Sequence, residues 1–220
     1  MSLVLRLHED ALSDDAAPIR FAALPRMIFV VHGTAIIDGR PVSDGEAWHG
    51  EGAITLTPGD TGVTIWRWEL SRGGDGAALE SAALGRGVAS LQKLSAILDT
   101  LPAGDLLLRG DSVAFPPGGC AFLHTRQGPG IRCLIEGAIR IDTHGRSTSY
   151  GPGGAWFESG PEPVFAQAAA DRPSRFIRVM VLPRALLGKS SIGYVNPEDA
   201  ARPKSQQYKV YVDAPIASVV

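Results

Sequence analysis

The chain has 220 residues, of which 45% are hydrophobic and 20% charged, and its net charge is -2. That length suffices for one large β domain or for two small domains with separate cores. No block of Lys and Arg suggests a nucleic-acid partner, and no apolar run is long enough to span a membrane. Two cysteines do not imply a disulfide framework, and the first residues lack the features of a signal peptide, so we expect a cytoplasmic protein.

Residues 1–71 have the pattern of short β-strands joined by tight turns. A strand of the buried type ends at Gly33, and the next one turns at Asp38 and Gly39, a pair typical of β-hairpins. Residues 64–70 (TIWRWEL) alternate between two faces, as expected of another strand. The pattern therefore predicts an N-terminal β domain.

A linker is predicted from residue 72 to residue 105. Residues 72–86 are rich in Gly and Ala and have little pattern. The segment that follows has apolar residues at helical spacing, and Pro102 and Gly104 would end a helix. These apolar residues are Val88, Leu91, Leu94, Ile97, Leu98 and Leu101. We therefore expect a linker, 72–105, with one amphipathic helix between the two β-rich parts of the chain.

The β pattern returns over residues 106–183 and predicts a C-terminal β domain. Residues 184–220 form a C-terminal arm, which contains a last strand-like stretch, KVYVD at 209–213. An exposed edge strand invites pairing with another chain, so this stretch is a candidate surface for a homodimer.

An internal repeat relates the two β-rich parts. The matching pairs are 29–40 with 133–146, 45–52 with 153–160, and 64–70 with 176–182. The matches keep their order, and the offset grows only from 104 (29 to 133) to 108 (45 to 153) over the first two. Two copies of one all-β unit are therefore expected.

These segments resemble the cupin superfamily, and the duplication makes the chain similar to a bicupin. The segments LIEG and GPGGAW and the spacing of Gly118, His124 and Gly137 carry the resemblance. It implies an all-β fold of two tandem cupin-type double-stranded β-helix (jelly-roll) barrels. The expected domains are a degenerate barrel at 1–71 and a second barrel at 106–183.

The resemblance also implies a metal site, most of whose ligands this chain lacks. Metal-dependent cupins use three His and one Glu, and of these positions only His124 keeps its ligand. Arg126 replaces the second His, Gly130 the Glu and Val164 the third His. A site of this kind needs about three protein ligands, and Arg supplies none. We therefore expect no cofactor; the alternative is a divalent Fe, Mn, Ni or Zn held by a non-standard set that includes His124.

The same substitutions predict a binding site for an anion. Alternate residues of a strand share a face, so His124, Arg126 and Arg132 should line one side of the C-terminal barrel. Guanidinium groups bind carboxylate or phosphate through paired hydrogen bonds. Trp156 is a candidate for the apolar wall of this site and Glu158 for a further contact. In the alternative interpretation, the two arginines pair with nearby Glu residues at the barrel rim, where such pairs add little stability.

The sequence leaves three functions open. The first is binding of a small organic acid, or of a similar metabolite, in the C-terminal barrel. The second is catalysis, either by a metal-dependent dioxygenase, decarboxylase or isomerase with non-standard ligands, or without metal through His124 as a general acid or base. The third is a structural or interaction protein that binds no ligand. No nucleic acid or membrane partner is expected in any of these cases.

Overall fold

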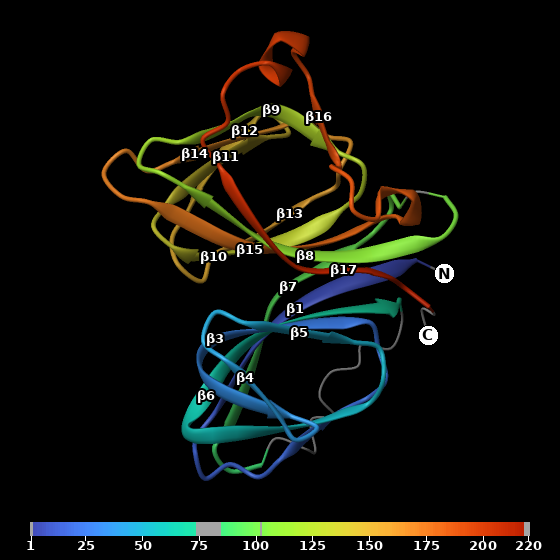
Figure 1. Ribbon diagram of the computed structural model, residues 1–220, viewed down its shortest axis with the longest axis vertical. Coiled ribbons are helices and arrows are strands. Elements are labelled where there is room, and N and C mark those ends of the chain that lie inside the picture. Colours follow the sequence, from blue (N-terminus) through green and yellow to red (C-terminus); the bar gives the residue numbers. More distant parts are fainter. Residues whose placement is uncertain (1, 74–84, 102, 218–220) are drawn as a thin grey trace. The chain divides into compact units, whose positions relative to one another are not determined.

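The computed structural model describes residues 2–73, 85–101 and 103–217, and it is built from β-strands (Figure 1). The chain divides into two compact units, residues 1–97 with 216–220, and residues 98–215. The strands of the first unit are β1 (Leu3–Leu12), β2 (Ile19–Phe21), β3 (Arg26–Ile37), β4 (Arg40–Ser43), β5 (Ala47–Gly50), β6 (Ile54–Arg72) and β7 (Val88–Ile97). No helix in the described residues has the length and apolarity needed to cross a membrane.

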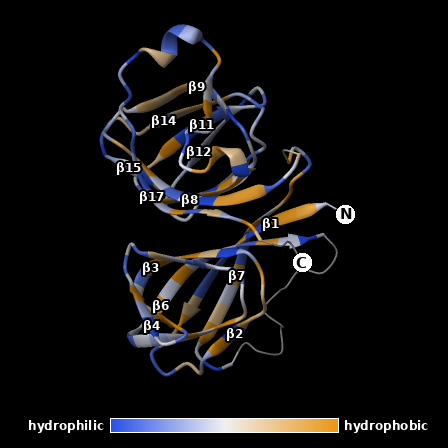
Figure 2. Cartoon of the chain, turned by 45° about the vertical axis from the view of Figure 1, so that its right-hand side comes forward, coloured by the Kyte–Doolittle hydropathy of each residue, from blue (hydrophilic) through white to orange (hydrophobic). Residues whose placement is uncertain are grey.

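The second unit has ten strands and two short 3-10 turns. The strands are β8 (Leu106–Phe115), β9 (Cys120–Arg126), β10 (Gly130–Glu136), β11 (Ile139–Thr143), β12 (Arg146–Tyr150), β13 (Ala155–Glu158), β14 (Val164–Ala168), β15 (Ser174–Pro183), β16 (Ile192–Tyr194) and β17 (Gln207–Pro215). The turns are η2 (Arg184–Leu186) and η3 (Pro197–Ala200). Figure 2 shows hydrophobic stretches along strands such as β1 and β8, whereas η3 is hydrophilic.

Strands β5-β3-β6-β1-β7 of the first unit have the same order as β13-β10-β15-β8-β17 of the second, as the internal repeat predicts. In the first unit, the path β3-β6-β1-β7 continues at β3 into both β4 and β5. The second unit has one sheet in the order β13-β10-β15-β8-β17 and a facing sheet in the order β12-β11-β14-β9-β16. All of these pairings are antiparallel. The predicted fold of two tandem jelly-roll barrels is confirmed.

Two glycines at equivalent repeat positions mark a corner of each barrel, within β3 in the first unit and between β10 and β11 in the second. Gly33 and Gly137 have φ values of 84° and 82°, which side chains other than glycine rarely adopt. A Cβ atom at Gly33 would lie 2.2 Å from the carbonyl oxygen of Gly62, and one at Gly137 would lie 2.1 Å from that of Pro173. Both corners therefore require glycine for the same two reasons, conformation and space.

The predicted linker helix is wrong, because Val88–Ile97 forms strand β7. This strand pairs with β1 along its whole length, from Val4 opposite Ile97 to Leu12 opposite Val88. Leu91 and Ile97 are 60% and 57% exposed, so their spacing does not mark a buried helical face. Strand β7 takes the same place in its sheet as β17 does in the second unit. Residues 74–84 of the predicted linker lie outside the described residues.

The predicted C-terminal arm contributes strands to the second barrel. Strand β16 pairs with β9, and β17 pairs with β8 from Gln207 opposite Ala114 to Pro215 opposite Leu107, with one register shift between Val210 and Val212. The strand predicted at 209–213 is therefore present, within β17. Because β17 is the last strand of its sheet, homodimer formation along its outer edge stays a prediction.

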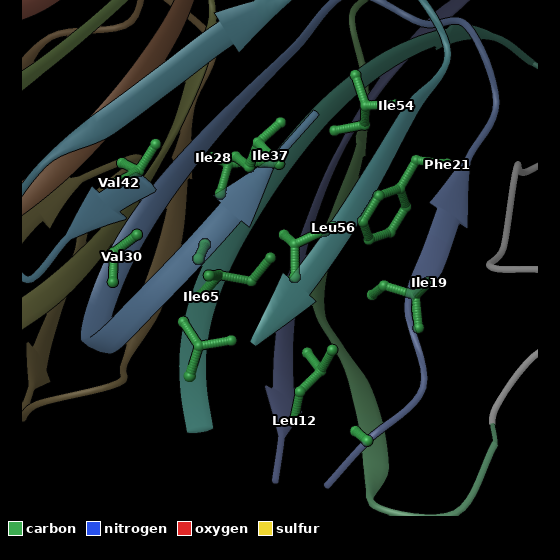
Figure 3. Close-up of a cluster of buried hydrophobic side chains, with 13 residues drawn as sticks. Leu12, Ile19, Phe21, Ile28, Val30, Ile37, Val42, Ile54, Leu56 and Ile65 are labelled. Atoms are coloured by element: carbon green, nitrogen blue, oxygen red, sulfur yellow. The ribbon is translucent and has the colours of Figure 1, made fainter. Parts of the chain in front are cut away.

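Each barrel has an apolar core and, next to it, a set of buried charges. The core of the first barrel gathers Ile28, Val30, Leu56, Ile65 and their neighbours, with Phe21 and Ile19 from β2 (Figure 3). Beside it lie four buried charged residues that pair with one another. Arg67 binds Asp10 and Glu69, and Arg26 binds Glu69 with 2.9 Å from Nε to Oε1. The interior of the first barrel is thus filled by apolar side chains and paired charges.

Candidate functional site

The interior of the C-terminal barrel changes from apolar to charged along the strands that build it. On β8, Phe115 and Val113 belong to the core, and the next two inward positions are Asp111 and Arg109. On β15, Phe176 lies across from Val113, and Arg178 lies across from Asp111. Because side chains alternate along a strand, these residues share the interior face of the sheet. The charged half of the barrel is the candidate site.

Two arginines of this half are neutralised by aspartates. Arg178 binds Asp111 through two hydrogen bonds, from Nε to Oδ1 at 2.8 Å and from Nη2 to Oδ2 at 2.7 Å. Arg109 binds Asp213 in the same bidentate way, at 2.9 and 3.0 Å. Such fork-like pairs hold both partners in one orientation. These two cations therefore have fixed partners within the protein.

A third buried pair joins β10 to β13. Arg132 is fully buried, and its Nη2 lies 2.6 Å from Oε2 of Glu158. The indole Nε1–H of Trp156 donates to Oε1 of the same carboxylate over 2.9 Å. Burial alone would raise the pKa of Glu158, but the positive charge of Arg132 and the indole hydrogen bond outweigh burial and hold this pKa below its usual range. Glu158 is thus a charged carboxylate that forms an ion pair with Arg132.

Arg126, on β9, differs from these arginines because it has no carboxylate partner. It is 8% exposed, it forms no ion pair among the described residues, and its Nε has no hydrogen-bond partner. Its guanidinium is a hydrogen-bond partner of the Tyr208 side chain, and burial together with the nearby charge of Arg178 lowers its pKa. A buried charge without a counter-ion costs several kcal/mol, roughly 3–5 in protein interiors. An anion supplied from outside would remove that cost.

His124 lies two residues before Arg126 and is buried as well. Its Nδ1 lies 2.7 Å from the carbonyl oxygen of Phe122, to which it donates. Burial and the charge of Arg126 lower the pKa of His124 to about 4. The imidazole is therefore neutral at physiological pH.

A pocket of about 350 Å³ opens at this charged half. Its walls come from β8, β15 and β17 of one sheet, from β9 and β16 of the facing sheet, and from the segments before β16 and β17. Arg126 and Gln206 contribute buried polar groups, whereas Ile192, Tyr194 and Val210 contribute apolar surface. Apolar walls with a few convergent polar groups are typical of small-molecule sites, and about 300–1,000 Å³ is their usual size.

The five predicted site residues lie in one buried cluster, but only Arg126 lines this pocket. Glu158 pairs with Arg132 and accepts a hydrogen bond from Trp156. His124 lies near enough for the charges of Arg126 and Glu158 to affect its pKa. Trp156 also stacks on a core ring, that of Tyr150, with 4.9 Å between centroids. The predicted rim pairing therefore holds for Arg132, in the barrel interior instead of at its rim, and not for Arg126.

Sequence reasoning missed most of the pocket wall. Five of the missed residues with a charged or polar side chain are Arg109, Asp111, Arg178, Gln206 and Tyr208. A signal for the first three was present, because they are charged residues inside strands that are otherwise apolar, LLLRGDSVAF and FIRVMVL. The other two belong to the C-terminal segment, whose return to the barrel has no local signal.

The metal site that the cupin resemblance implies does not fit this barrel. Val164 lies directly across from His124, so an apolar side chain occupies the expected place of a ligand. A Cβ atom at Gly130, the expected Glu position, would lie 2.4 Å from the carbonyl oxygen of Val179. No three His, Cys, Asp or Glu side chains in the described parts of the chain gather in the manner of a metal site. The residues present therefore do not form the family's metal-binding set.

The fold has close counterparts among solved structures. No protein-family model and no curated protein sequence matches the chain. The salicylate 1,2-dioxygenase from Pseudaminobacter salicylatoxidans matches with a TM-score of 0.55 and 12% identity, over 94% of this chain and 75% of that one. A variant of the oxalate decarboxylase from Bacillus subtilis matches with a TM-score of 0.56 and 12% identity, over 92% and 70%. At such identities the likeness establishes the fold alone: the chain has the two-barrel fold of the bicupins.

Proposed function

We propose that the protein binds a small organic anion, a carboxylate, in the pocket of its C-terminal barrel. The observation that carries this proposal is Arg126, a buried guanidinium at the wall of a pocket with no counter-ion in the described parts of the chain. A carboxylate on Arg126 would form charge-assisted hydrogen bonds and would neutralise the unpaired cation. In this proposal Arg126 contacts the ligand directly. Arg132, Glu158, Trp156 and His124 form a buried cluster near Arg126.

The named activities of the structural neighbours support a carboxylate. Salicylate and oxalate are both small carboxylic acids, and one neighbouring structure was obtained in complex with gentisate. Catalysis is the second candidate, and the residues offer less for it. His124 is neutral and lies outside the pocket wall, and Glu158 is committed to Arg132. Binding is therefore the better supported function.

The test is a carboxylate screen by thermal shift and titration calorimetry, with an Arg126→Gln variant. Wild type should gain stability with at least one small carboxylate, and Arg126→Gln should bind it at least about 10-fold more weakly, because one charge-assisted hydrogen bond contributes about 1.5–3 kcal/mol. Arg140→Gln is the matched control, since Arg140 is 48% exposed on the same barrel and pairs with Asp142. Unchanged binding in Arg126→Gln would refute the proposal.

The stability of the ligand-free protein supplies a second readout. Removing an uncompensated buried cation should not destabilise the barrel, so Arg126→Met should be as stable as the ligand-free wild type or more stable. A large loss of stability in Arg126→Met would mean that Arg126 serves the fold instead of a ligand.

A further inference from the structure

We infer that the C-terminal pocket selects a monocarboxylate that also carries a hydroxyl group. This inference rests on the proposed function, because it takes an anion to occupy the pocket. Two features carry it: the number of unpaired charges in the pocket wall, and the side chain of Gln206.

Among the described residues that line the pocket, the ion pairs leave one buried cation for a ligand. Arg109 and Arg178 are each held by two hydrogen bonds to an aspartate, Asp213 and Asp111. Lys189 is exposed and solvated, and Lys204 donates to backbone carbonyl oxygens, including that of Arg202 at 2.5 Å. Arg126 is thus the buried cation that remains without a carboxylate. A ligand with a single negative charge balances it, whereas a second negative charge would lie near the two aspartates.

The side chain of Gln206 indicates which second functional group the ligand carries. This residue precedes β17, it is 7% exposed, and it lines the pocket. Neither its Nε2 nor its Oε1 has a hydrogen-bond partner among the residues that the structure describes. Leaving a buried donor and a buried acceptor unsatisfied costs about 1–3 kcal/mol for each group. A hydroxyl group both donates and accepts, so one hydroxyl on the ligand can serve both atoms of the amide.

Other substituents fit this wall less well. An ammonium group, as in an amino acid, would donate to Oε1 but could accept nothing from Nε2. It would also bring a positive charge close to Arg126 and Arg178. An apolar substituent would leave both amide atoms unsatisfied. The pocket should therefore rank a hydroxy acid above the corresponding acid, amino acid and diacid.

Titration calorimetry on the full chain can test this ranking with matched probes. Mandelate, phenylacetate, phenylglycine and phenylmalonate share one phenyl group and differ only in the second substituent. Lactate, propionate, alanine and malonate repeat the comparison on a smaller body. In the series that binds, we expect the hydroxy acid to bind about 10-fold more tightly than its deoxy analogue, which is the effect of one or two neutral hydrogen bonds.

Two variants test whether Gln206 causes the preference for the hydroxy acid. Gln206→Met keeps the length of the side chain and removes both polar atoms, so the preference for the hydroxy acid should shrink to about twofold or less. Gln207→Met is the matched control on an exposed neighbouring residue and should keep the 10-fold preference. The comparison of probes on wild type does not depend on either variant folding.

The possible results distinguish a failure of the hydroxyl preference from a failure of the proposed anion binding. If the deoxy acid or the diacid binds wild type as tightly as the hydroxy acid, and Arg126→Gln weakens this binding, the anion site stands and the hydroxyl selection is wrong. If the preference persists in Gln206→Met, Gln206 is not its source and the inference fails. If no probe of either series binds, the proposed function fails and the inference fails with it.

Discussion

His124 shows how one buried residue makes the stability of the barrel depend on pH. Its pKa is lowered to about 4 by burial and by the charge of Arg126, whereas the ordinary value is 6.5. As the pH falls below 6.5, the unfolded chain takes up this proton first, so the folded state loses stability. The contribution is complete above pH 6.5 and is lost as the pH falls to 4, and it amounts to about 3 kcal/mol.

Replacing His124 by Asn should remove this part of the pH dependence. Asn keeps a donor for the carbonyl oxygen of Phe122 but does not titrate. The free energy of unfolding, measured by urea denaturation, should fall less steeply in His124→Asn than in wild type between pH 6.5 and 4. His144→Asn is the control, because the side chain of His144 is 62% exposed. Parallel curves for wild type and His124→Asn would contradict the buried, neutral imidazole.

At the scale of elements, strand β7 is the point where the sequence misleads. Its apolar residues recur every third position, which satisfies a helical period. In the structure this spacing places them on both faces of an edge strand, and Leu91 and Ile97 are exposed. Only the pairing with β1, a long-range contact, decides between helix and strand, and a local pattern does not contain it.

A serine on β7 provides the test of this pairing. Ser90 donates from Oγ to Asp10, a fully buried carboxylate that also accepts from Nε of Arg67 at 2.8 Å. Ser90→Ala should lower the free energy of unfolding by about 1.5 kcal/mol, since it removes a hydrogen bond to a charged group. Ser95→Ala, at an exposed position of the same strand, should change it by less than about 0.5 kcal/mol. Equal effects of the two substitutions would argue against β7 as a strand docked on β1.

Much of the fold was predictable, and the candidate site was predictable only in part. The alternation of side chains along a strand predicted that His124 and Arg126 share one face. The internal repeat predicted two barrels with the same fold. The pairing of Arg132 with Glu158 depends on the register between β10 and β13, and the side chain of Tyr208 reaches Arg126 because β17 pairs with β8. Register and strand return are set by contacts between distant segments, so the sequence pattern alone did not reveal them.

At the scale of the whole molecule, the two barrels differ in how their buried charges are satisfied. In the first barrel Arg26 and Arg67 have Glu69 and Asp10 as partners. In the second, Arg126 has no carboxylate among the residues that the structure describes. Among the described residues, the buried arginines of the first barrel thus have carboxylate partners, whereas Arg126 of the second barrel has none.

Ligand binding should accordingly protect only one unit from hydrogen exchange. With a carboxylate that binds at saturation, peptides from β8, β9, β16 and β17 should exchange more slowly, because these strands form the pocket wall. Peptides from β1 to β6 should keep their exchange rates. Mass spectrometry of the exchanged, digested protein gives the readout, with Arg126→Gln as the control that shows no change. Equal protection of both units would contradict a site confined to the C-terminal barrel.

The uncompensated charge of Arg126 also has a consequence for the amount of protein in a cell. A ligand present at 100 times its Kd stabilises the folded state by about 2.7 kcal/mol, which lowers the unfolded population about 100-fold. Proteases that act on opened molecules degrade the protein in proportion to that population. Turnover of the chain would then slow when the acid is plentiful and quicken when it is scarce, so that its abundance follows the supply of its ligand.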